Sequence, residues 1–205
     1  MKLILSSLVF LLFFQAYAQK DTSQQIDAEG VKSIYINTDE VFKIHLKTTK
    51  KDFISISTHA EGEYFNDIAL NSEMKGNSLF LSTQFRKILQ SGFDKLSAHK
   101  VFSLEIILEV PEDLQVFIKS NIASVEAAGH YKFLQVQLNS GYCNVSSFLG
   151  DALINTFDGG ISIQTTDATV TATSRNGEVN VKSNFSGKHQ ITANSINGAI
   201  LVTKN

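Results

Sequence analysis

Residues 134–165 read LQVQLNSGYCNVSSFLGDALINTFDGGISIQT, and this stretch decides the fold. Apolar side chains occupy alternate positions on both sides of two bends, Ser140-Gly141 and Asp158-Gly159. Period-two alternation is typical of a strand with one buried face, and a small polar residue followed by glycine is typical of a tight turn. The stretch therefore predicts short strands joined by bends that recur every 18 residues.

The same pattern extends in both directions along the chain. Five bend positions follow one another at separations of 20, 18, 18 and 21 residues: Ser120, Ser140, Asp158, Asn176 and Asn197. Four apolar ladders keep register with these bends: Leu114, Leu134, Ala152, Val170 and Ile191; Val116, Val136, Ile154, Ala172 and Ala193; Ala123, Cys143, Ile161, Val179 and Ile200; Val125, Val145, Ile163, Val181 and Val202. Repeats of this kind indicate five copies of one structural unit.

A unit of about 18 to 21 residues matches one winding of a β-solenoid, in which successive windings stack in parallel about 4.8 Å apart. An antiparallel meander would not place equivalent positions on top of one another. We therefore expect Cys143 to lie between Ala123 and Ile161 in a buried column, and the bend residues to form a hydrogen-bonded polar ladder. The extra residues of the longer copies are expected in the bends 129–133 and 187–190.

The predicted fold class is all-β: a single-stranded β-solenoid with coils of about 18–21 residues and an irregular, strand-rich N-terminal half. The regular repeats span 114–205, and the irregular part of the solenoid spans 31–113. Alternating apolar residues predict its strands: Ile34 and Ile36; Phe42, Ile44 and Leu46; Ile54 and Ile56; Leu79–Leu81; Val101–Val110. Residues 84–100 break the alternation and are expected to form an irregular insertion with a helical turn, or a loop that folds back on the sheet.

The first 18 residues have the pattern of a signal peptide. Lys2 precedes an apolar run from Leu3 to Phe14, and the small-x-small sequence Ala16-Tyr17-Ala18 predicts cleavage before Gln19. Residues 19–30 are polar and aperiodic, and are expected to be a flexible leader. The protein is thus expected to be exported to the periplasm, the cell surface or the medium, with no membrane insertion after cleavage.

Charge and cysteine content narrow the classes of partner. The formal net charge is −2, with Lys and Arg scattered singly, whereas a nucleic-acid-binding protein needs a clustered basic face. No nucleic-acid partner is therefore expected. The single cysteine, Cys143, excludes an internal disulfide, so packing and hydrogen bonds must hold the fold.

No residue combination predicts a catalytic, cofactor or metal site, and none is assigned. Cys143 occupies a core ladder position and is interpreted as a buried structural thiol. His130 and His189 are interpreted as surface residues in the variable bends, because no two histidines have metal-ligand spacing. Asp158, with Arg175 in the next repeat, is the nearest approach to an active site of the kind found in β-helical polysaccharide lyases and hydrolases. It is interpreted as a turn residue, because no second carboxylate accompanies it.

These features together resemble a group of bacterial adhesin-like families. The resemblance lies in the signal peptide, the irregular alternating strands, the boundary Val110-Pro111 before Leu114, and the short coils with Asn-Gly or Ser-Gly bends, over residues 31–205. The families are the auto-transporter adhesin "head GIN" domain and its β-strand-repeat relatives. The literal Gly-Ile-Asn tripeptide is absent; Ser195-Ile196-Asn197-Gly198 is one of its nearest approaches. The resemblance implies a β-helical fold, a cell-envelope setting and an adhesive role, without catalytic or ligand residues.

Three functions remain open at this point. The first is an exported, non-catalytic scaffold that binds surface polysaccharide or protein. The second is a carbohydrate-active β-helix enzyme, and the third is an envelope component that works by stacking with itself. Because the last predicted strand, Ala199–Thr203, would leave an unpaired edge, we also expect a homo-oligomer through the C-terminal coil.

Overall fold

The computed structural model describes residues 19–62, 68–85 and 102–205. Within these residues every regular element is a β-strand. The strands are β1 (Gln19–Asp27), β2 (Ser33–Thr38), β3 (Lys43–Thr49), β4 (Phe53–Gly62), β5 (Ile68–Lys75), β6 (Ser78–Phe85), β7 (Phe102–Pro111), β8 (Gln115–Ser120), β9 (Ser124–Ser140), β10 (Cys143–Asp158), β11 (Ile161–Thr165), β12 (Ala168–Ser174), β13 (Val179–Val181), β14 (His189–Ser195) and β15 (Ile200–Lys204). The chain is all-β, as predicted. The expected signal peptide and most of the expected insertion at 84–100 lie outside the described residues.

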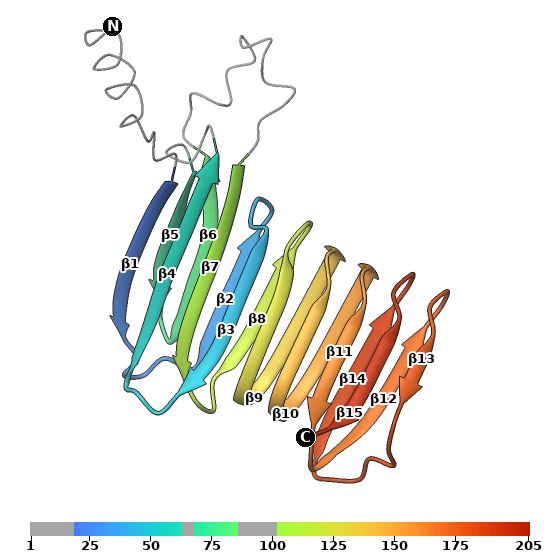
Figure 1. Ribbon diagram of the computed structural model, residues 1–205. Helices are drawn as coiled ribbons and strands as arrows, with labels where there is room; N and C mark the ends of the chain where they lie inside the picture. The colour runs from blue at the N-terminus through green and yellow to red at the C-terminus, as the bar shows by residue number, and fades with distance from the viewer. Residues whose placement is uncertain (1–18, 63–67, 86–101) are drawn as a thin grey trace, which may run out of the picture.

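The strands form two rows that face each other across the core (Figure 1). One row runs β1-β4-β7-β3-β9-β10-β11-β15-β13. The other runs β5-β6-β2-β8-β9-β10-β14-β12. β9 and β10 belong to both rows, because each bends at a corner where its pairing register shifts.

In one row all pairs from β7 to β13 are parallel, and in the other row all pairs from β6 to β12 are parallel, as the repeat predicts. At the opposite end β1 pairs with β4, β4 with β7, and β5 with β6, and these three pairs are antiparallel. The sheet is therefore mixed, and the purely parallel coil expected for the N-terminal half is not what this end contains. The prediction of a flexible leader at 19–30 is also wrong, because residues 19–27 form strand β1. Its side chains are mostly exposed, so backbone pairing fixes it without leaving a periodic pattern in the sequence.

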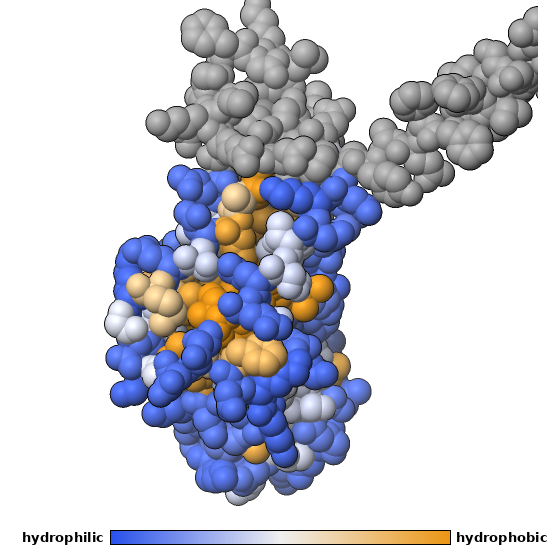
Figure 2. Space-filling model, turned by 90° about the vertical axis from the view of Figure 1, so that its left-hand side faces the viewer, coloured by the Kyte–Doolittle hydropathy of each residue, from blue (hydrophilic) through white to orange (hydrophobic). Residues whose placement is uncertain are grey.

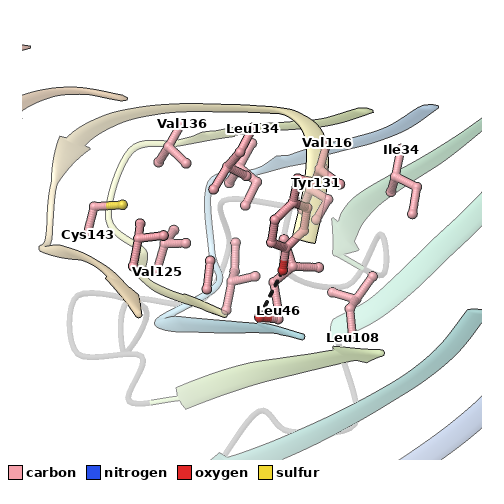
Figure 3. Packing of buried hydrophobic residues seen from close by; sticks show 14 of the residues in the cluster. Ile34, Leu46, Leu108, Val116, Val125, Tyr131, Leu134, Val136 and Cys143 are labelled. Atoms are coloured by element: carbon pink, nitrogen blue, oxygen red, sulfur yellow. Dashed lines mark hydrogen bonds between the residues drawn. The ribbon is translucent and has the colours of Figure 1, made fainter. Parts of the chain in front are cut away.

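The core consists of the inward residues of both rows. Figure 3 shows side chains from the two rows pointing toward one another, with Leu134 and Val136 on one side and Val125 and Cys143 on the other. The Tyr131 side chain fills the corner between the rows and is buried; its hydroxyl donates to the carbonyl of Ala128 at 2.9 Å and lies 3.3 Å from that of Leu46. Of the apolar residues predicted for the core, Phe42, Val179 and Val181 are wrong: they are 58%, 39% and 41% exposed, and Val41 is buried in place of Phe42.

The winding length is more regular than the sequence predicts. Val116 pairs with Leu134 and Leu134 with Ala152, each 18 residues further along the chain. In the copy around Ser120, the pairing thus differs by two residues from the pairing predicted by aligning the bends. Cys143, for example, pairs with Val125 and not with Ala123. Because the displacement is even, every side chain keeps its face. No extra residues lie at 129–133. An insertion does lie near the second predicted place, but it occupies 182–188, between β13 and β14, and residues 189 and 190 already belong to β14.

The last two windings do not follow chain order. β14 pairs with both β10 and β12, and β15 pairs with both β11 and β13. The final winding therefore lies inside the stack, and the winding of β12 and β13 forms its end (Figure 1). The unpaired edge expected at the last strand is consequently at β13 and β12. The longer connection after β13 lets the chain cross back inward, and the final winding brings bulkier residues to the interior, with Ile191 and Ile200 where the end winding has Val170 and Val179.

Glycine at the bends permits the windings to approach closely. A Cβ on Gly159 would lie 1.8 Å from the carbonyl oxygen of Gly141, and a Cβ on Gly198 would lie 1.8 Å from that of Gly159. No side chain fits in either space. The bends therefore stack in the order 141, 159, 198, 177, since a Cβ on Gly177 would in turn meet the carbonyl of Gly198.

Figure 2 looks onto the opposite end of the stack, which β1 and β5 form. Apolar side chains are visible there within a hydrophilic surround. Ile26 and Leu70 pack against the core and are partly buried, and Met74 is 44% exposed. β1 and β5 each pair with one neighbour and not with each other, so the sandwich is open between them in the described part of the chain.

Candidate binding surface

One outer face of the stack carries almost no charge. Alternation in β2 buries Ile34 and Ile36 and turns Tyr35 and Asn37 outward, and the paired strands repeat this arrangement. We call the outward residues of β6, β2, β8, β9, β10 and β14 the amide face. Its two central rows are Phe80, Tyr35, Phe117, Gln135, Leu153 and Thr192, and Ser82, Asn37, Lys119, Gln137, Asn155 and Asn194.

Aromatic rings form a column along one half of the amide face. Tyr35 is stacked between Phe80 and Phe117, with ring centroids 4.8 and 4.7 Å apart and planes within 9° and 8° of parallel. Phe133 lies beside Phe117 at 5.9 Å but is tilted by 57°. At the other end the ammonium group of Lys75 lies 5.3 Å from the Phe80 ring centroid. The three parallel rings present their edges outward, and the tilted ring of Phe133 breaks the column.

Two adjoining hollows that share Lys119 and Gln137 lie across this face, and together we call them the groove. Its first part is bordered by Tyr35, Phe80, Phe117, Asn37, Lys119, Gln135 and Gln137. Its second part shares Lys119 and Gln137, and adds Asn121, Asn139, Asn155, Phe157, Asn194 and Ile196. The amide of Asn194 donates to the side-chain oxygen of Asn155 at 3.0 Å, which holds both side chains in place. The groove crosses β6, β2, β8, β9, β10 and β14, or about 24 Å at the usual strand spacing.

The opposite face of the stack is charged. Glu126 on β9 contacts three side chains: the ammonium group of Lys43 at 2.8 Å, Nδ1 of His45 at 3.1 Å, and the hydroxyl of Tyr142, which donates to it at 2.8 Å. The hydrogen bond from Lys43 is the main reason that the pKa of Glu126 lies below its usual range. The same contacts raise the pKa of Lys43 and of Tyr142.

This cluster keeps Glu126 in its ionised form. A general acid needs a carboxyl group whose pKa is raised toward neutrality, whereas Glu126 is held ionised by its neighbours. The described residues contain no group of three His, Cys, Asp or Glu side chains that could hold a metal ion. The contacts of Glu126 form a surface network that joins β3, β9 and the bend before β10.

The residues singled out in the sequence lie apart from both faces. Cys143 is fully buried, as its ladder position predicts, and burial raises its pKa to about 12. Asp158 lies in the bend ladder, where its side chain accepts a hydrogen bond from Asn197 at 2.5 Å. Asn197 in turn accepts from Asn176 at 2.7 Å, so this part of the predicted polar ladder is present. The winding of Asn197 separates Asp158 from Arg175, and the two do not form a pair.

The two bend histidines differ from each other. The His130 side chain is 35% exposed and its Nε2 lies 3.4 Å from Asp113, in keeping with a surface position. The His189 side chain is only 18% exposed, and its Nδ1 lies 3.5 Å from Asp151. The surface position predicted for His189 is therefore wrong, because this residue begins β14, which the final winding places inside the stack.

The amide face cannot be recognised from the sequence pattern alone. Its aromatic rings come from β6, β2, β8 and β9, which are remote from one another in the chain. The available signal was an aromatic residue between two apolar core residues, in Ile34-Tyr35-Ile36, Leu79-Phe80-Leu81 and Val116-Phe117-Ile118. Each triplet looks like an ordinary strand, and only the parallel register of β6, β2 and β8 brings the three rings together.

The described part of the chain contains no helix that is long and apolar enough to cross a membrane. No protein-family model matches the chain, and no curated protein matches it. Among solved structures, the chain is similar to a candidate cell adhesion protein from Clostridium sporogenes, with a TM-score of 0.65 and 16% sequence identity over 91% of this chain and 100% of that one.

Two further solved structures are more distant. A candidate adhesin from Bacteroides fragilis has a TM-score of 0.43 and 11% identity, over 90% of this chain and 97% of that one. A candidate lipid-binding protein from Parabacteroides distasonis has a TM-score of 0.33 and 10% identity, over 91% and 95%. The likeness to the Clostridium protein establishes that this chain shares its all-β fold, at a sequence identity too low to carry over what that protein does.

Proposed function

We propose that this protein is an exported, non-catalytic, adhesin-like β-solenoid whose amide face binds a neutral polysaccharide of a cell surface or envelope. The observation that carries the proposal is the groove across that face, which combines aromatic rings with a row of primary amides. Among the described residues that line it, Lys119 alone is charged. The groove is open along its length, which suits a linear polymer and not a small molecule enclosed in a pocket.

The chemistry of the groove favours hydroxyl groups as ligands. Each Asn or Gln amide offers both donors and an acceptor, and a sugar hydroxyl can use either. The ring edges and the exposed side chain of Phe157 offer apolar contact to the C–H surfaces of a sugar ring. An acidic polymer or a nucleic acid would need several cations, and the groove provides one.

An enzymatic alternative would require a pair of carboxyl groups on either side of a scissile bond. The amide-face groove has no carboxylate among its lining residues in the described part of the chain. On the charged face, the ionised state of Glu126 disfavours a general-acid role. These observations support a binding function, and a carbohydrate-active enzyme is kept as the second candidate.

Two observations support an adhesive role outside the cell. Residues 1–18 have the sequence pattern of a signal peptide. The solved structure with the same fold carries the name of a candidate cell adhesion protein. Stacked windings with their hydrogen bonds running along the stack also give a rigid platform, on which a repeating ligand can meet repeating side chains.

The test is binding of the exported chain to an array of neutral and acidic polysaccharides, followed by calorimetry on the best ligand. Gln137→Ala and Asn155→Ala should each weaken binding at least several-fold, because both side chains line the groove. Tyr142→Ala removes a part-exposed aromatic ring from the charged face and should leave affinity unchanged. Preference for acidic polymers, or equal loss with Tyr142→Ala, would contradict the proposal. Turnover of the bound polymer would favour the enzyme instead.

A further inference from the structure

β13 ends one row of the stack and exposes two side chains that belong to the core pattern. Val179 and Val181 occupy ladder positions opposite Ile200 and Val202 of β15. Ile200 and Val202 are 1% and 0% exposed, whereas Val179 and Val181 are 39% and 41% exposed. Valines at these positions bury their side chains only when another strand lies beyond them.

The outer edge of β13 has hydrogen-bonding groups to offer. The amide of Lys182, just after β13, donates to the carbonyl of Val202, and the carbonyl of Glu178, just before β13, accepts from the amide of Ile200. The backbone groups of the even-numbered residues therefore point toward β15. Backbone groups alternate in direction along a strand, which turns the N–H and C=O of Val179 and Val181 toward the free edge. Unpaired groups of this kind are a template for another strand.

We propose that the occupant of this edge is β13 of a second copy of the chain, paired antiparallel about Asn180. The sequence Glu178-Val179-Asn180-Val181-Lys182 is self-complementary in that arrangement. Each Val179 lies opposite a Val181, and each Glu178 lies opposite a Lys182, twice by symmetry. Such a contact is isologous, as in most symmetric dimers.

The hydrogen-bond pattern fits this register. Opposite residues in an antiparallel pair alternate between those that exchange two backbone hydrogen bonds and those that exchange none. Val179 and Val181, which face the edge, form the bonded pairs. Asn180 and the Glu178–Lys182 pairs fall on the non-bonded positions, where opposite side chains are closest.

Charge favours a copy of this chain over an unrelated strand. Within the described part of the chain, Glu178 and Lys182 have no ion-pair partner, and they stand at opposite ends of the exposed strand. The neighbouring edge, β12, is less accessible, because Gly187 packs against Asp167 and Ala168, and its carbonyl accepts a hydrogen bond from Thr169. The contact is therefore confined to β13.

Charge reversal tests the pairing by sedimentation velocity on the exported full chain. Glu178→Lys alone, or Lys182→Glu alone, places like charges opposite each other twice and should weaken the dimer at least tenfold. The double variant Glu178→Lys/Lys182→Glu restores opposite charges and should restore the dimer. Mixing the two single variants should give a heterodimer, although neither associates with itself. Rescue in the double variant and in the mixture excludes misfolding as the cause of the loss.

A cysteine at the symmetry axis tests the register. Asn180→Cys should form an intermolecular disulfide on oxidation, because the Cα atoms of a non-bonded antiparallel pair lie about 4.5 Å apart, within reach of a disulfide. Glu178→Cys is the control: the two introduced cysteines would lie about 13 Å apart and should not be linked. A monomer at all concentrations, a dimer indifferent to the charge reversals, or equal cross-linking of both cysteine variants would each overturn the proposal.

Discussion

Ile161 pairs directly with Ile200 in parallel register. Ile161 belongs to β11 and Ile200 to β15, and the winding that contains β12 and β13 lies between them in the sequence but outside them in the stack. The winding at the end of the stack therefore comes earlier in the sequence than the winding next to it. Residues that share a ladder consequently differ in burial according to this order.

Val181 and Val202 pair with each other in adjacent windings. Because both are valines, the same substitution at each position tests the order of the two windings in the stack. Val202→Ala removes a fully buried side chain and should lower the free energy of unfolding by about 2–3 kcal/mol. Val181→Ala removes a side chain that is 41% exposed and should cost less than about 1 kcal/mol. Urea denaturation at a protein concentration low enough to keep the chain monomeric measures both. A larger loss for Val181→Ala would mean that the windings follow chain order.

Sequence patterns predicted which face of a strand each ladder residue occupies, but neither the register of the first copy nor the order of the windings in space. Alternation identifies which residues of a winding point inward, and it does so equally for Val179 and Ile200. Swapping two whole windings changes no residue's face, so no period in the sequence records it. The two-residue shift in pairing near Ser120 could not be predicted for a related reason: an even shift leaves every side chain on the same face of its strand. The amide face depends on the same register, and was therefore missed.

Cys143 should be inert in the folded protein. It is fully buried between Val125 and Ile161, and burial raises its pKa to about 12, so thiolate is absent at neutral pH. A thiol reagent at pH 8 should label no cysteine in the native chain and one per chain in urea. Labelling of the native chain at the denatured rate would show that the repeat opens at this winding.

His59 should make the attachment of β1 depend on pH. Its ring lies 2.7 Å from Glu61 and 2.6 Å from Asp21 of β1, and these two hydrogen bonds, that of Glu61 foremost, raise its pKa from 6.5 to about 9. A group whose pKa is higher in the folded state stabilises that state fully below pH 6.5, and this contribution is lost as the pH rises through 9. Stability should therefore fall between these values.

Urea denaturation at pH 6, 7.5 and 9.5 measures that fall. His59→Gln keeps a polar side chain but cannot carry the charge, and should flatten the pH dependence over this range. His130→Gln, at a corner remote from β1 in the sequence, should leave the fall in place. Equal slopes for wild type and His59→Gln would show that the contacts with Asp21 and Glu61 do not stabilise the fold.

The bend ladder should be sensitive to the position of its one carboxylate. Asn197 donates to Asp158 and accepts from Asn176, so its side chain connects three windings. Asn197→Asp removes the donor and places two carboxylates side by side, and should cost about 1–2 kcal/mol at pH 7. Most of the loss should disappear below pH 4, where a protonated carboxyl group can donate in place of the amide.

The double variant Asp158→Asn/Asn197→Asp separates charge repulsion from the loss of a hydrogen bond. It exchanges the roles of the two side chains, so an amide at 158 donates to a carboxylate at 197, which still accepts from Asn176. Stability should return to within about 0.5 kcal/mol of wild type, which gives a coupling energy of opposite sign to the single loss. If the double variant is as unstable as Asn197→Asp, the side chains at 158 and 197 do not interact, and the bends are held by their backbone and glycines alone.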